Sequence, residues 1–442
     1  MRPPRHVLVV SPHFPPDSTA GTHRARLLAP RLREHGWEPT VLTVDPRDYE
    51  GALDPALAAS VPDDLRVVRS RAWPVWLTRS LGVGDLGLRA FEGLWREASH
   101  LLAHERFDAL FITIYPTYPA LLGPLLKWRF RVPFVLDYQD PWVGAWGHSV
   151  GAGANGRADF RSRASRFAAT HLEPIALRSA DGVTAVSRAT FEQALERNPG
   201  ARPLATAELP IGWDPRDVAF LTSRAQSPRP VRGGDGLVHV VYVGTLLPTG
   251  LETFRAVCAA LARLRARDAA SAARVRLDCF GTSNQRSAAA PPRAVPIARE
   301  LGVDDLVTEH PARLDYFDAL QTLADATAVL LMGSSEPHYT PSKAFPAMLS
   351  GRPLLAIYHT DSPVCDLLRR FGAPPAVRLI TFDGEHTAMA HIDEIATALC
   401  ELARNPPSGA RLEDRHVLDA LSASALAGRL AEVLDRVSAV AH

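Results

Sequence analysis

HVLVVS, at residues 6–11, is the stretch of sequence that decides the fold. Its length and its valine and leucine content are those of a strand buried on both faces of a parallel sheet. Apolar residues then recur at helical spacing over 22–35, and a second apolar run, PTVLTV, follows at 39–44. A strand, a helix and a second strand in this order predict a βαβ unit.

The same alternation continues along the chain in two halves. Further strands are predicted in the first half at 107–114, 133–138 and 182–187, and in the second half at 238–244, 275–281, 326–332 and 353–358. A segment rich in Ser, Pro, Arg and Gly, at 223–236, separates the halves and is typical of a linker or exposed loop. We therefore expect an α/β protein with two doubly wound, Rossmann-like domains, one over 1–220 and one over 221–410, followed by a helical segment over 411–442.

The composition excludes several classes of protein. The chain has 442 residues, is 46% hydrophobic, and carries 49 basic against 48 acidic side chains. This balance argues against a disordered chain, a nucleic-acid binder and a polybasic surface binder. The four cysteines are far apart and contain no C-x-x-C pair, which predicts neither a metal site nor a disulfide framework and favours a reducing compartment. With no long apolar window and no obvious signal peptide, a cytoplasmic location is expected.

Ligands of doubly wound sheets bind beyond the carboxyl ends of the strands, so the loops that follow strands are the places to look. With two such domains, we expect a cleft between them. The loop at 11–24 is too long for a tight turn and ends at Gly21, just before a helix, while the loop at 242–254 has Gly244 at its turn. Asp137 and Asp140 follow another strand, where they could transfer protons or serve a structural or binding role. Histidines in these loops, such as His13, are candidate bases.

The segment at 334–356 carries the strongest signal for a ligand. Pro341 and Ser342 stand where the first turn of a helix is predicted, so that free amides would be available to an anion. Lys343 sits in the same turn, where a cation opposes the helix dipole unless an anion is bound there. The chain contains only one other lysine, Lys127, among 49 basic residues, so Lys343 is not a generic positive charge. We predict that Lys343 contacts phosphate.

Six motifs, taken in order, resemble the retaining GT-B glycosyltransferases of family four, which use nucleotide sugars. They are VLVVSPHFPPDSTAGTHRARLLAPRLREHGWEPTVLT, VPFVLDYQDPW, LRSADGVTAVS, LPIGWD, VYVGTL and PSKAFPAMLSGRPLLA. The resemblance covers nearly the whole chain. It implies an acceptor-binding N-terminal domain, a nucleotide-sugar donor domain, and a C-terminal helix that crosses back to the first domain. It also implies hexosyl transfer in carbohydrate biosynthesis with retention of configuration, no metal and no cofactor beyond the donor substrate.

The resemblance also assigns residues to the two sides of the reaction. The donor side would comprise Gly244, Thr245, His310, Tyr339, Thr340, Ser342 and Lys343. On the acceptor side we expect His13, Gly21, Arg24 and Asp140, and the candidate catalytic groups are His13, Asp140 and Lys343. The loop at 310–315 would hold the base of the nucleotide.

The sequence departs from the family pattern at four positions. Thr245 and Thr249 stand where family members usually have Arg and Lys, and His338 and Pro346 align with the usual pair of glutamates. Pro346 is also predicted to fall inside a helix, where proline costs about 3 kcal/mol unless the helix bends or restarts. These departures support an alternative, a catalytically inactive relative that binds a nucleotide sugar or a partner. A sugar-nucleotide epimerase is a third interpretation. The absence of a visible set of catalytic carboxylates in the sequence argues against it.

The acceptor class is left open by the sequence, which is compatible with a small molecule, a glycan or a lipid-linked acceptor. Residues 72–102 carry Trp73, Trp76, Phe91 and Trp95 with arginines between them. Such a stretch could dock at a membrane surface, or it could be an ordinary amphipathic helix pair packed on the N-terminal domain.

Overall fold

The computed structural model describes residues 3–51, 53–80, 83–143, 160–223, 231, 235–283, 285–287, 289–334, 344–406 and 415–440. The chain divides into two compact units. Unit 1 comprises Met1–Asp214 and Leu421–His442, and unit 2 comprises Pro215–Ala420. The division falls after Asp214, where we predicted a boundary near residue 220.

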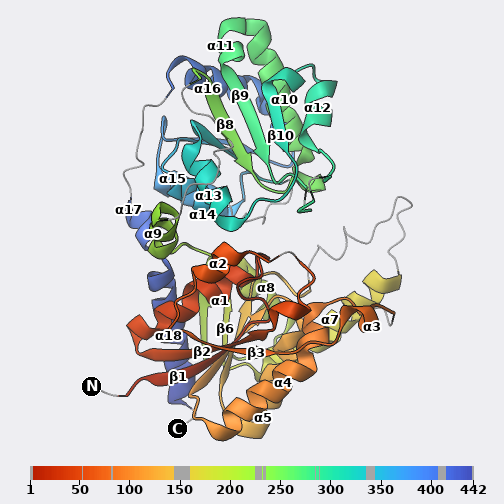
Figure 1. The fold of residues 1–442 in the computed structure, drawn as a ribbon, viewed down its shortest axis with the longest axis vertical. Helices are drawn as coiled ribbons and strands as arrows, with labels where there is room; N and C mark the ends of the chain where they lie inside the picture. The colour runs from red at the N-terminus through yellow and green to blue at the C-terminus, as the bar shows by residue number, and fades with distance from the viewer. Residues whose placement is uncertain are drawn as a thin grey trace. The chain divides into compact units, whose positions relative to one another are not determined.

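Unit 1 is built on a parallel sheet of seven strands in the order β3-β2-β1-β4-β5-β6-β7 (Figure 1). The strands are β1 (Arg5–Val10), β2 (Trp37–Val44), β3 (Arg66–Ser70), β4 (Ala109–Ile114), β5 (Phe134–Tyr138), β6 (Gly182–Ala185) and β7 (Ala205–Glu208). The helices are α1 (Thr22–Leu28), α2 (Pro55–Ala59), α3 (Val75–Ser80), α4 (Leu86–His104), α5 (Leu122–Phe130), α7 (Phe160–Ser179), α8 (Arg188–Arg197) and α18 (Ala423–Ala439).

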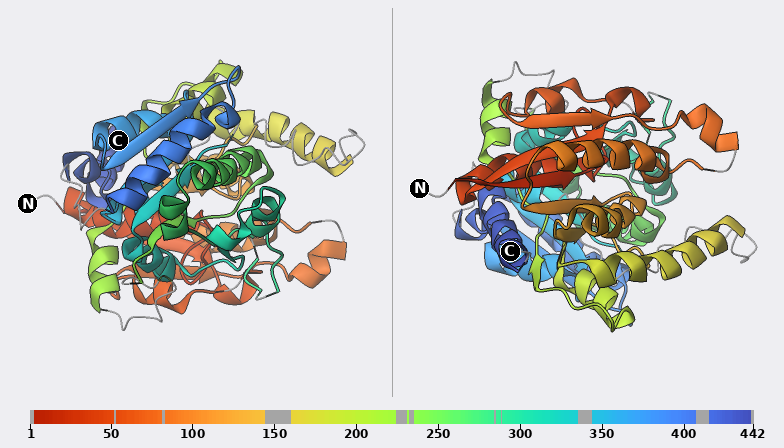
Figure 2. Two further views of the ribbon diagram at one scale, coloured as in Figure 1. Left: turned by 90° about the horizontal axis from the view of Figure 1, so that it is seen from above. Right: turned by 90° about the horizontal axis from the view of Figure 1, so that it is seen from below.

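The central strand β1 shows why this sheet is buried on both faces. Its side chains alternate, so that Leu8 and Val10 join the core beneath α4 and α5, while Val7 and Val9 join the core beneath α1 and α18. Figures 1 and 2 show α4 and α5 side by side along this sheet. The C-terminal helix α18 packs in unit 1 against β7 and the 3₁₀ segment at Ala29–His35.

Unit 2 repeats the same plan with a parallel sheet of six strands in the order β10-β9-β8-β11-β12-β13. The strands are β8 (Val238–Val243), β9 (Val275–Phe280), β10 (Val307–His310), β11 (Ala328–Met332), β12 (Leu354–His359) and β13 (Val377–Phe382). The helices are α9 (Pro215–Ser223), α10 (Leu251–Arg267), α11 (Ala269–Arg274), α12 (Ala294–Glu300), α13 (Tyr316–Asp325), α14 (Ala344–Leu349), α15 (Pro363–Phe371), α16 (Ile392–Arg404) and α17 (Arg415–Asp419). The fold class predicted from the sequence, two doubly wound α/β domains, is confirmed.

The predicted helix over 22–35 is wrong in its second half. The α-helix ends at Leu28, and residues Ala29–His35 continue as a 3₁₀ helix. Pro30 explains the change, because it has no amide to donate to the carbonyl four residues earlier and its ring would crowd that carbonyl.

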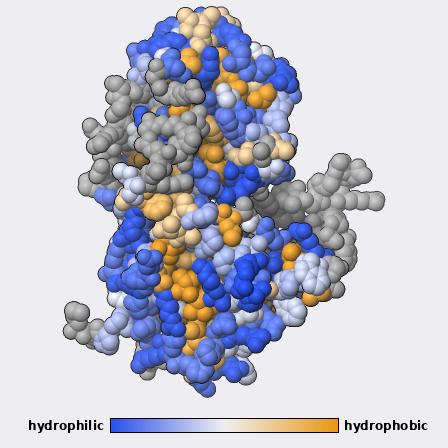
Figure 3. Space-filling model, viewed as in Figure 1, coloured by the Kyte–Doolittle hydropathy of each residue, from blue (hydrophilic) through white to orange (hydrophobic). Residues whose placement is uncertain are grey.

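Aromatic residues of the 72–102 stretch divide into two groups. Phe91 and Trp95, on α4, pack against the core of unit 1. Trp73 and Trp76 are exposed, by 49% and 75%. On the face shown in Figure 3, hydrophilic residues predominate and apolar residues form narrower streaks between them. In the described part of the chain, no helix combines the length and apolarity needed to cross a bilayer, and a peripheral membrane contact stays a prediction.

One buried histidine of unit 2 makes the stability of that unit sensitive to pH. His239, on β8, lies between two carboxylates, with Nδ1 2.7 Å from Oδ2 of Asp278 and Nε2 3.0 Å from Oδ2 of Asp235. Ionised carboxylates only accept hydrogen bonds, so both ring nitrogens must carry protons and the ring is an imidazolium. Burial alone would lower the pKa of His239, but the two carboxylates outweigh it and raise the pKa above its usual 6.5.

We predict that His239→Gln removes a pH dependence of the unfolding free energy. Because the pKa of His239 is raised in the folded protein, its protonation stabilises the fold fully below about pH 6.5. This stabilisation is lost as the pH rises through the pKa of His239 in the folded state. The wild type should therefore lose more stability than the variant between pH 6 and pH 9 in urea denaturation. His386→Gln is a matched control, because the pair of His386 with Asp383 is exposed to solvent. An identical slope in the wild type and His239→Gln would contradict the assignment.

Candidate functional site

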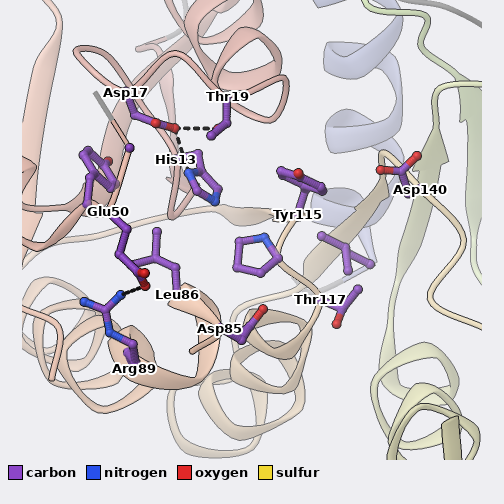
Figure 4. Close-up of a pocket in the computed structure, with 14 residues that line it drawn as sticks. His13, Asp17, Thr19, Glu50, Asp85, Leu86, Arg89, Tyr115, Thr117 and Asp140 are labelled. Carbon is purple, nitrogen blue, oxygen red and sulfur yellow. Dashed lines mark hydrogen bonds and ion pairs between the residues drawn. The ribbon is translucent and has the colours of Figure 1, made fainter. Parts of the chain in front are cut away.

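A cavity of about 440 Å³ opens in unit 1 where the strand order reverses between β1 and β4 (Figure 4). The loops after β1, β2, β4 and β5 and the start of α4 surround it. Its lining residues are His13, Asp17, Thr19, Tyr49, Glu50, Gly51, Asp85, Leu86, Arg89, Ile114, Tyr115, Pro116, Thr117 and Asp140. Two of the four residues predicted for the acceptor side, His13 and Asp140, are thus brought together.

His13 and Asp17 form a hydrogen-bonded pair on the wall made by the loop after β1. Nδ1 of His13 lies 2.7 Å from Oδ2 of Asp17, and the hydroxyls of Thr19 and Thr22 donate to the same oxygen at 2.5 and 2.9 Å. Burial raises the pKa of Asp17, but the hydrogen bonds from His13, Thr19 and Thr22 outweigh it, and the net pKa is lowered. Asp17 is therefore a carboxylate that fixes the orientation of the imidazole.

Two tyrosines hold the ring of His13 from its sides. The ring stacks on Tyr49, with centroids 6.0 Å apart, and lies tilted against Tyr115 at 5.6 Å. Because Nδ1 is engaged by Asp17, the opposite nitrogen, Nε2, faces the cavity (Figure 4). Gly21 contributes room rather than a ligand contact, since a Cβ there would lie 2.4 Å from Cδ1 of Tyr115.

The start of α4 and the loop after β2 supply the opposite wall. Asp85 caps α4 by accepting the amide of Leu88 at 2.9 Å, and burial raises the pKa of its carboxyl above the usual value. Glu50 pairs with Arg89 at 2.8 Å and with Arg79 at 2.7 Å. This wall is therefore polar and its acidic groups outnumber the one arginine that lines it.

Asp140 completes the cavity from the loop after β5 and makes no hydrogen bond or ion pair with any residue that the structure describes. Partial desolvation by the surrounding protein raises the pKa of Asp140 to about 6. The residue still keeps contact with solvent. A carboxyl with no partner and a pKa near neutrality costs stability, which is typical of a functional group rather than a structural one.

Arg24, also predicted for the acceptor side, is buried instead of lining the cavity. Its Nε lies 2.8 Å from Oδ2 of Asp137, on β5, and both side chains are fully inaccessible to solvent. Asp137 also accepts the hydroxyl of Thr184, on β6, at 2.8 Å. Of the two carboxylates predicted after this strand, Asp137 is therefore structural and only Asp140 reaches the cavity.

In unit 2, the predicted donor loop forms a small hollow of about 20 Å³ at the corresponding reversal of strand order, between β8 and β11. Thr245, Thr249 and Gly250 line it, together with Gly333 and Ser334 of the loop after β11. Gly244 ends the strand by donating its amide to the carbonyl of Phe280 at 2.8 Å. The loop after β8 and the start of the loop that leads to Lys343 therefore lie side by side.

The remaining predicted donor residues have different outcomes. His310 ends β10, and its ring stacks on Phe280 with centroids 4.7 Å apart. Tyr339, Thr340, Ser342, Lys343 and His338 lie outside the described residues. Pro346 lies in α14 (Ala344–Leu349), and the residues just before Ala344 lie outside the described part of the chain. How far Pro346 is from the start of the helix, and what it costs there, stays a prediction. The predicted interdomain cleft stays a prediction.

Sequence reasoning missed most residues of the cavity wall, among them Tyr49, Glu50, Asp85, Tyr115 and Thr117. Tyr115 and Thr117 follow directly on the predicted strand at 107–114, so the rule of searching each strand end could have found them. Asp85 carries a weaker signal, an acidic residue just before a helical pattern, which by itself predicts only an N-cap. Tyr49 and Glu50 have no local signal, because only the packing of the loop after β2 brings them to the cavity.

We predict that Asp140→Asn raises the melting temperature slightly at pH 7.5 and leaves it unchanged at pH 4. A raised carboxyl pKa means that ionisation penalises the folded state, and the penalty develops as the pH rises from about 4 to above 6. Because Asp140 is exposed, we expect a gain of only about 1–2 °C. The control is Asp63→Asn, at an exposed position. Asp108→Asn would be a poor control, because Asp108 accepts a hydrogen bond from the amide of His6 and its loss would itself change stability. A loss of stability in Asp140→Asn at pH 7.5 would contradict the assignment.

Comparison with known proteins agrees with this architecture. Residues 19–210 match the model of the glycosyl transferase 4-like domain. No curated protein matches the sequence. Among solved structures, HepE of Anabaena in complex with UDP-glucose has a TM-score of 0.59 at 15% identity, over 97% of this chain and 99% of that one. A UDP-forming α,α-trehalose-phosphate synthase from Burkholderia xenovorans has a TM-score of 0.60 at 13% identity, over 98% and 99%. Residues 19–210 are therefore similar to a glycosyl transferase 4-like domain, and the chain as a whole has the GT-B fold of these solved structures.

Proposed function

We propose that the protein transfers a glycosyl group from a nucleotide-sugar donor to an acceptor hydroxyl bound in the cavity of unit 1. The observation that carries this proposal is the cavity itself. In it, the oriented imidazole of His13 and the carboxyl of Asp140, which no described residue pairs, lie beyond the strand ends of a family 4-like domain. We further propose that the transfer retains the anomeric configuration and needs no metal, as in the family that the sequence resembles.

His13 is the proposed proton acceptor. Asp17 is ionised and can only accept, so Nδ1 of His13 carries the proton of that hydrogen bond and Nε2 is left as an acceptor. An acceptor hydroxyl that donates to Nε2 would pass its proton there as its oxygen forms the new bond to the anomeric carbon. For the configuration to be retained, this bond must form on the same face from which the diphosphate leaves. Asp17 would stabilise the resulting imidazolium. Asp140, across the cavity, would hold a second group of the acceptor.

Unit 2 is the proposed donor site. The hollow between β8 and β11 lies at the start of α10, a helix of 17 residues whose first amides favour a negative charge. Lys343 follows in the adjacent loop. As the bond between the anomeric carbon and the diphosphate breaks, these groups would stabilise the negative charge that develops on the leaving nucleotide diphosphate. The complexes of Anabaena HepE with UDP and with UDP-glucose support a nucleotide-sugar ligand for this fold.

A non-catalytic nucleotide-sugar-binding protein is the second candidate, favoured by a specific observation. Thr245 and Thr249 occupy the positions of the usual Arg and Lys, and both line the donor hollow. Loss of two cations weakens the stabilisation of a leaving diphosphate. Binding without turnover would support this candidate.

One set of experiments separates the two candidates. Thermal shift with nucleotide diphosphates and nucleotide sugars identifies the donor, because a ligand stabilises only a protein that binds it. Release of nucleotide diphosphate is then followed with candidate acceptors, with and without EDTA, and the anomeric configuration of the product is read by NMR. Turnover that EDTA abolishes, or a product of inverted configuration, would contradict the corresponding part of the proposal.

We predict that His13→Gln lowers kcat by about 10²–10⁴-fold, the usual contribution of a general base. Glutamine can still donate to Asp17 but is not a base, so the melting temperature should change little. The control is His104→Gln at the exposed end of α4, where Nδ1 of the histidine is 2.8 Å from the carbonyl oxygen of His100 and the two rings lie against each other. Full activity in His13→Gln would show that the proton goes elsewhere.

We predict that Lys343→Ala lowers turnover, or the affinity for nucleotide diphosphate, by at least about ten-fold, since a charge-assisted contact to phosphate contributes roughly 1.5–3 kcal/mol. Lys343→Arg should recover only part of this. The other lysine of the chain is the control. Lys127 donates to Asp181 at 2.6 Å and to the carbonyl of Ser179 at 3.0 Å, so Lys127→Ala should lower stability without changing nucleotide affinity. Donor affinity that survives in Lys343→Ala would refute the phosphate assignment.

A further inference from the structure

The cavity of unit 1 has an excess of negative charge. Four carboxylic acids line it, Asp17, Glu50, Asp85 and Asp140, and the one arginine in the lining is Arg89. An anionic ligand, such as a phosphorylated sugar, would therefore need a cation that is free to meet it.

Arg89 is not free to do so. Its side chain is 2% exposed, and each of its three nitrogens donates to the protein. Nε donates to the carbonyl of Trp73 at 2.9 Å, one terminal nitrogen to Glu50 at 2.8 Å, and the other to the carbonyl of Asp48 at 2.9 Å. Arg89 is thus a buried structural contact that neutralises Glu50, and its burial leaves it little access to a ligand.

The other basic groups near the cavity do not balance this charge. Arg79 pairs with Glu50 from outside the lining, Arg69 is near Tyr49 but is not in the lining, and His13 is held by Asp17. Counting all three arginines against the four carboxylates still leaves the negative charge in excess. Two carboxylates are left unbalanced by the residues that the structure describes. Asp85 accepts amides at the start of its own helix, and Asp140 has no partner there.

The rest of the lining suits a polyhydroxyl molecule. Tyr49 and Tyr115 present aromatic faces, Thr117 a hydroxyl, and Nε2 of His13 an acceptor. Carboxylates accept hydrogen bonds from hydroxyls and from protonated amines, and they repel phosphate and carboxylate groups.

From this charge distribution we infer that the acceptor is an uncharged or amine-bearing polyhydroxyl compound, and that the cavity excludes phosphorylated acceptors. The inference rests on the proposed function, because it names the substrate class of the proposed acceptor site. It separates this protein from one of its structural neighbours, the Burkholderia synthase captured with glucose-6-phosphate.

The charge of the cavity can be measured without knowing the acceptor. Thr117→Cys places a thiol in the lining, in a background where Cys400→Ser removes the one cysteine that is not buried. Its reaction rates with cationic and anionic methanethiosulfonate reagents of similar size, MTSET and MTSES, report the local potential. The control thiol is Leu125→Cys, on the exposed surface of α5. After normalisation to a free thiol, the MTSET-to-MTSES ratio at Thr117→Cys should exceed that of the control by about ten-fold or more.

Two further variants assign that potential to its sources. Asp140→Asn and Asp85→Asn should each lower the ratio severalfold, and asparagine at position 85 keeps the helix cap. A ratio at Thr117→Cys equal to that of the control, or one that neither variant changes, overturns the inference.

Turnover provides a second, independent measurement. We compare matched acceptors in the presence of the donor found by thermal shift. Glucose is compared with glucosamine and with glucose 6-phosphate, and mannose is compared with mannose 6-phosphate. Higher kcat/KM for the phosphorylated member of a pair overturns the inference, and higher kcat/KM for the unphosphorylated member supports it. If no acceptor supports turnover, the proposed function fails in this assay, while the thiol measurement still decides whether the cavity excludes anions.

Discussion

A buried ion pair, Arg24 with Asp137, holds together the part of the molecule on which the cavity depends. Arg24 belongs to α1 and Asp137 to β5, and neither side chain is accessible to solvent. Burial lowers the pKa of Arg24 and raises that of Asp137, so each charge is unfavourable without the other. Removing one partner of such a pair typically costs about 3–5 kcal/mol, because the remaining charge stays buried.

The consequence of this pair is the position of the loop after β1. That loop leads directly into α1, so the helix that Arg24 anchors also fixes the end of the segment carrying His13 and Asp17. Thr22, at the first position of α1, donates to Asp17 and links the helix to the cavity wall. The orientation of the imidazole thus depends on a hierarchy of contacts, from a structural ion pair to a hydrogen-bonded carboxylate and then to the ring. Asp140 takes no part in these contacts, and among the described residues its carboxyl has no partner, which leaves it available to a ligand.

The sheets of both units have the same strand order around their first strand. In each, the first strand lies inside the sheet, the next two add on one side of it and the later strands on the other. Loops on either side of the first strand must separate at this reversal, which leaves a hollow beyond the strand ends. Unit 1 lines this hollow with carboxylates, an imidazole and tyrosines, whereas unit 2 lines it with threonines, glycines and a helix start. The same topology therefore supports two different chemistries, which suits a protein that handles two substrates.

The sequence by itself determined the fold class and every interior strand of both sheets. All nine predicted strands, such as HVLVVS at 6–11, lie inside the sheets of the described structure, and the four strands that were missed, β3, β7, β10 and β13, are the edges. The reason is physical, since interior strands of parallel sheets are buried on both faces and give continuous apolar runs, while edge strands are partly exposed and short. Only the tertiary structure decided the roles of the polar residues. Arg24 and Asp140 are both charged residues near loops in the sequence. Long-range packing buries Arg24 against Asp137, while Asp140 lies at the cavity with no partner in the described part of the chain. The local sequence cannot encode this difference, because the partner of a charged side chain can come from a strand or loop more than a hundred residues away, as Asp137 does for Arg24.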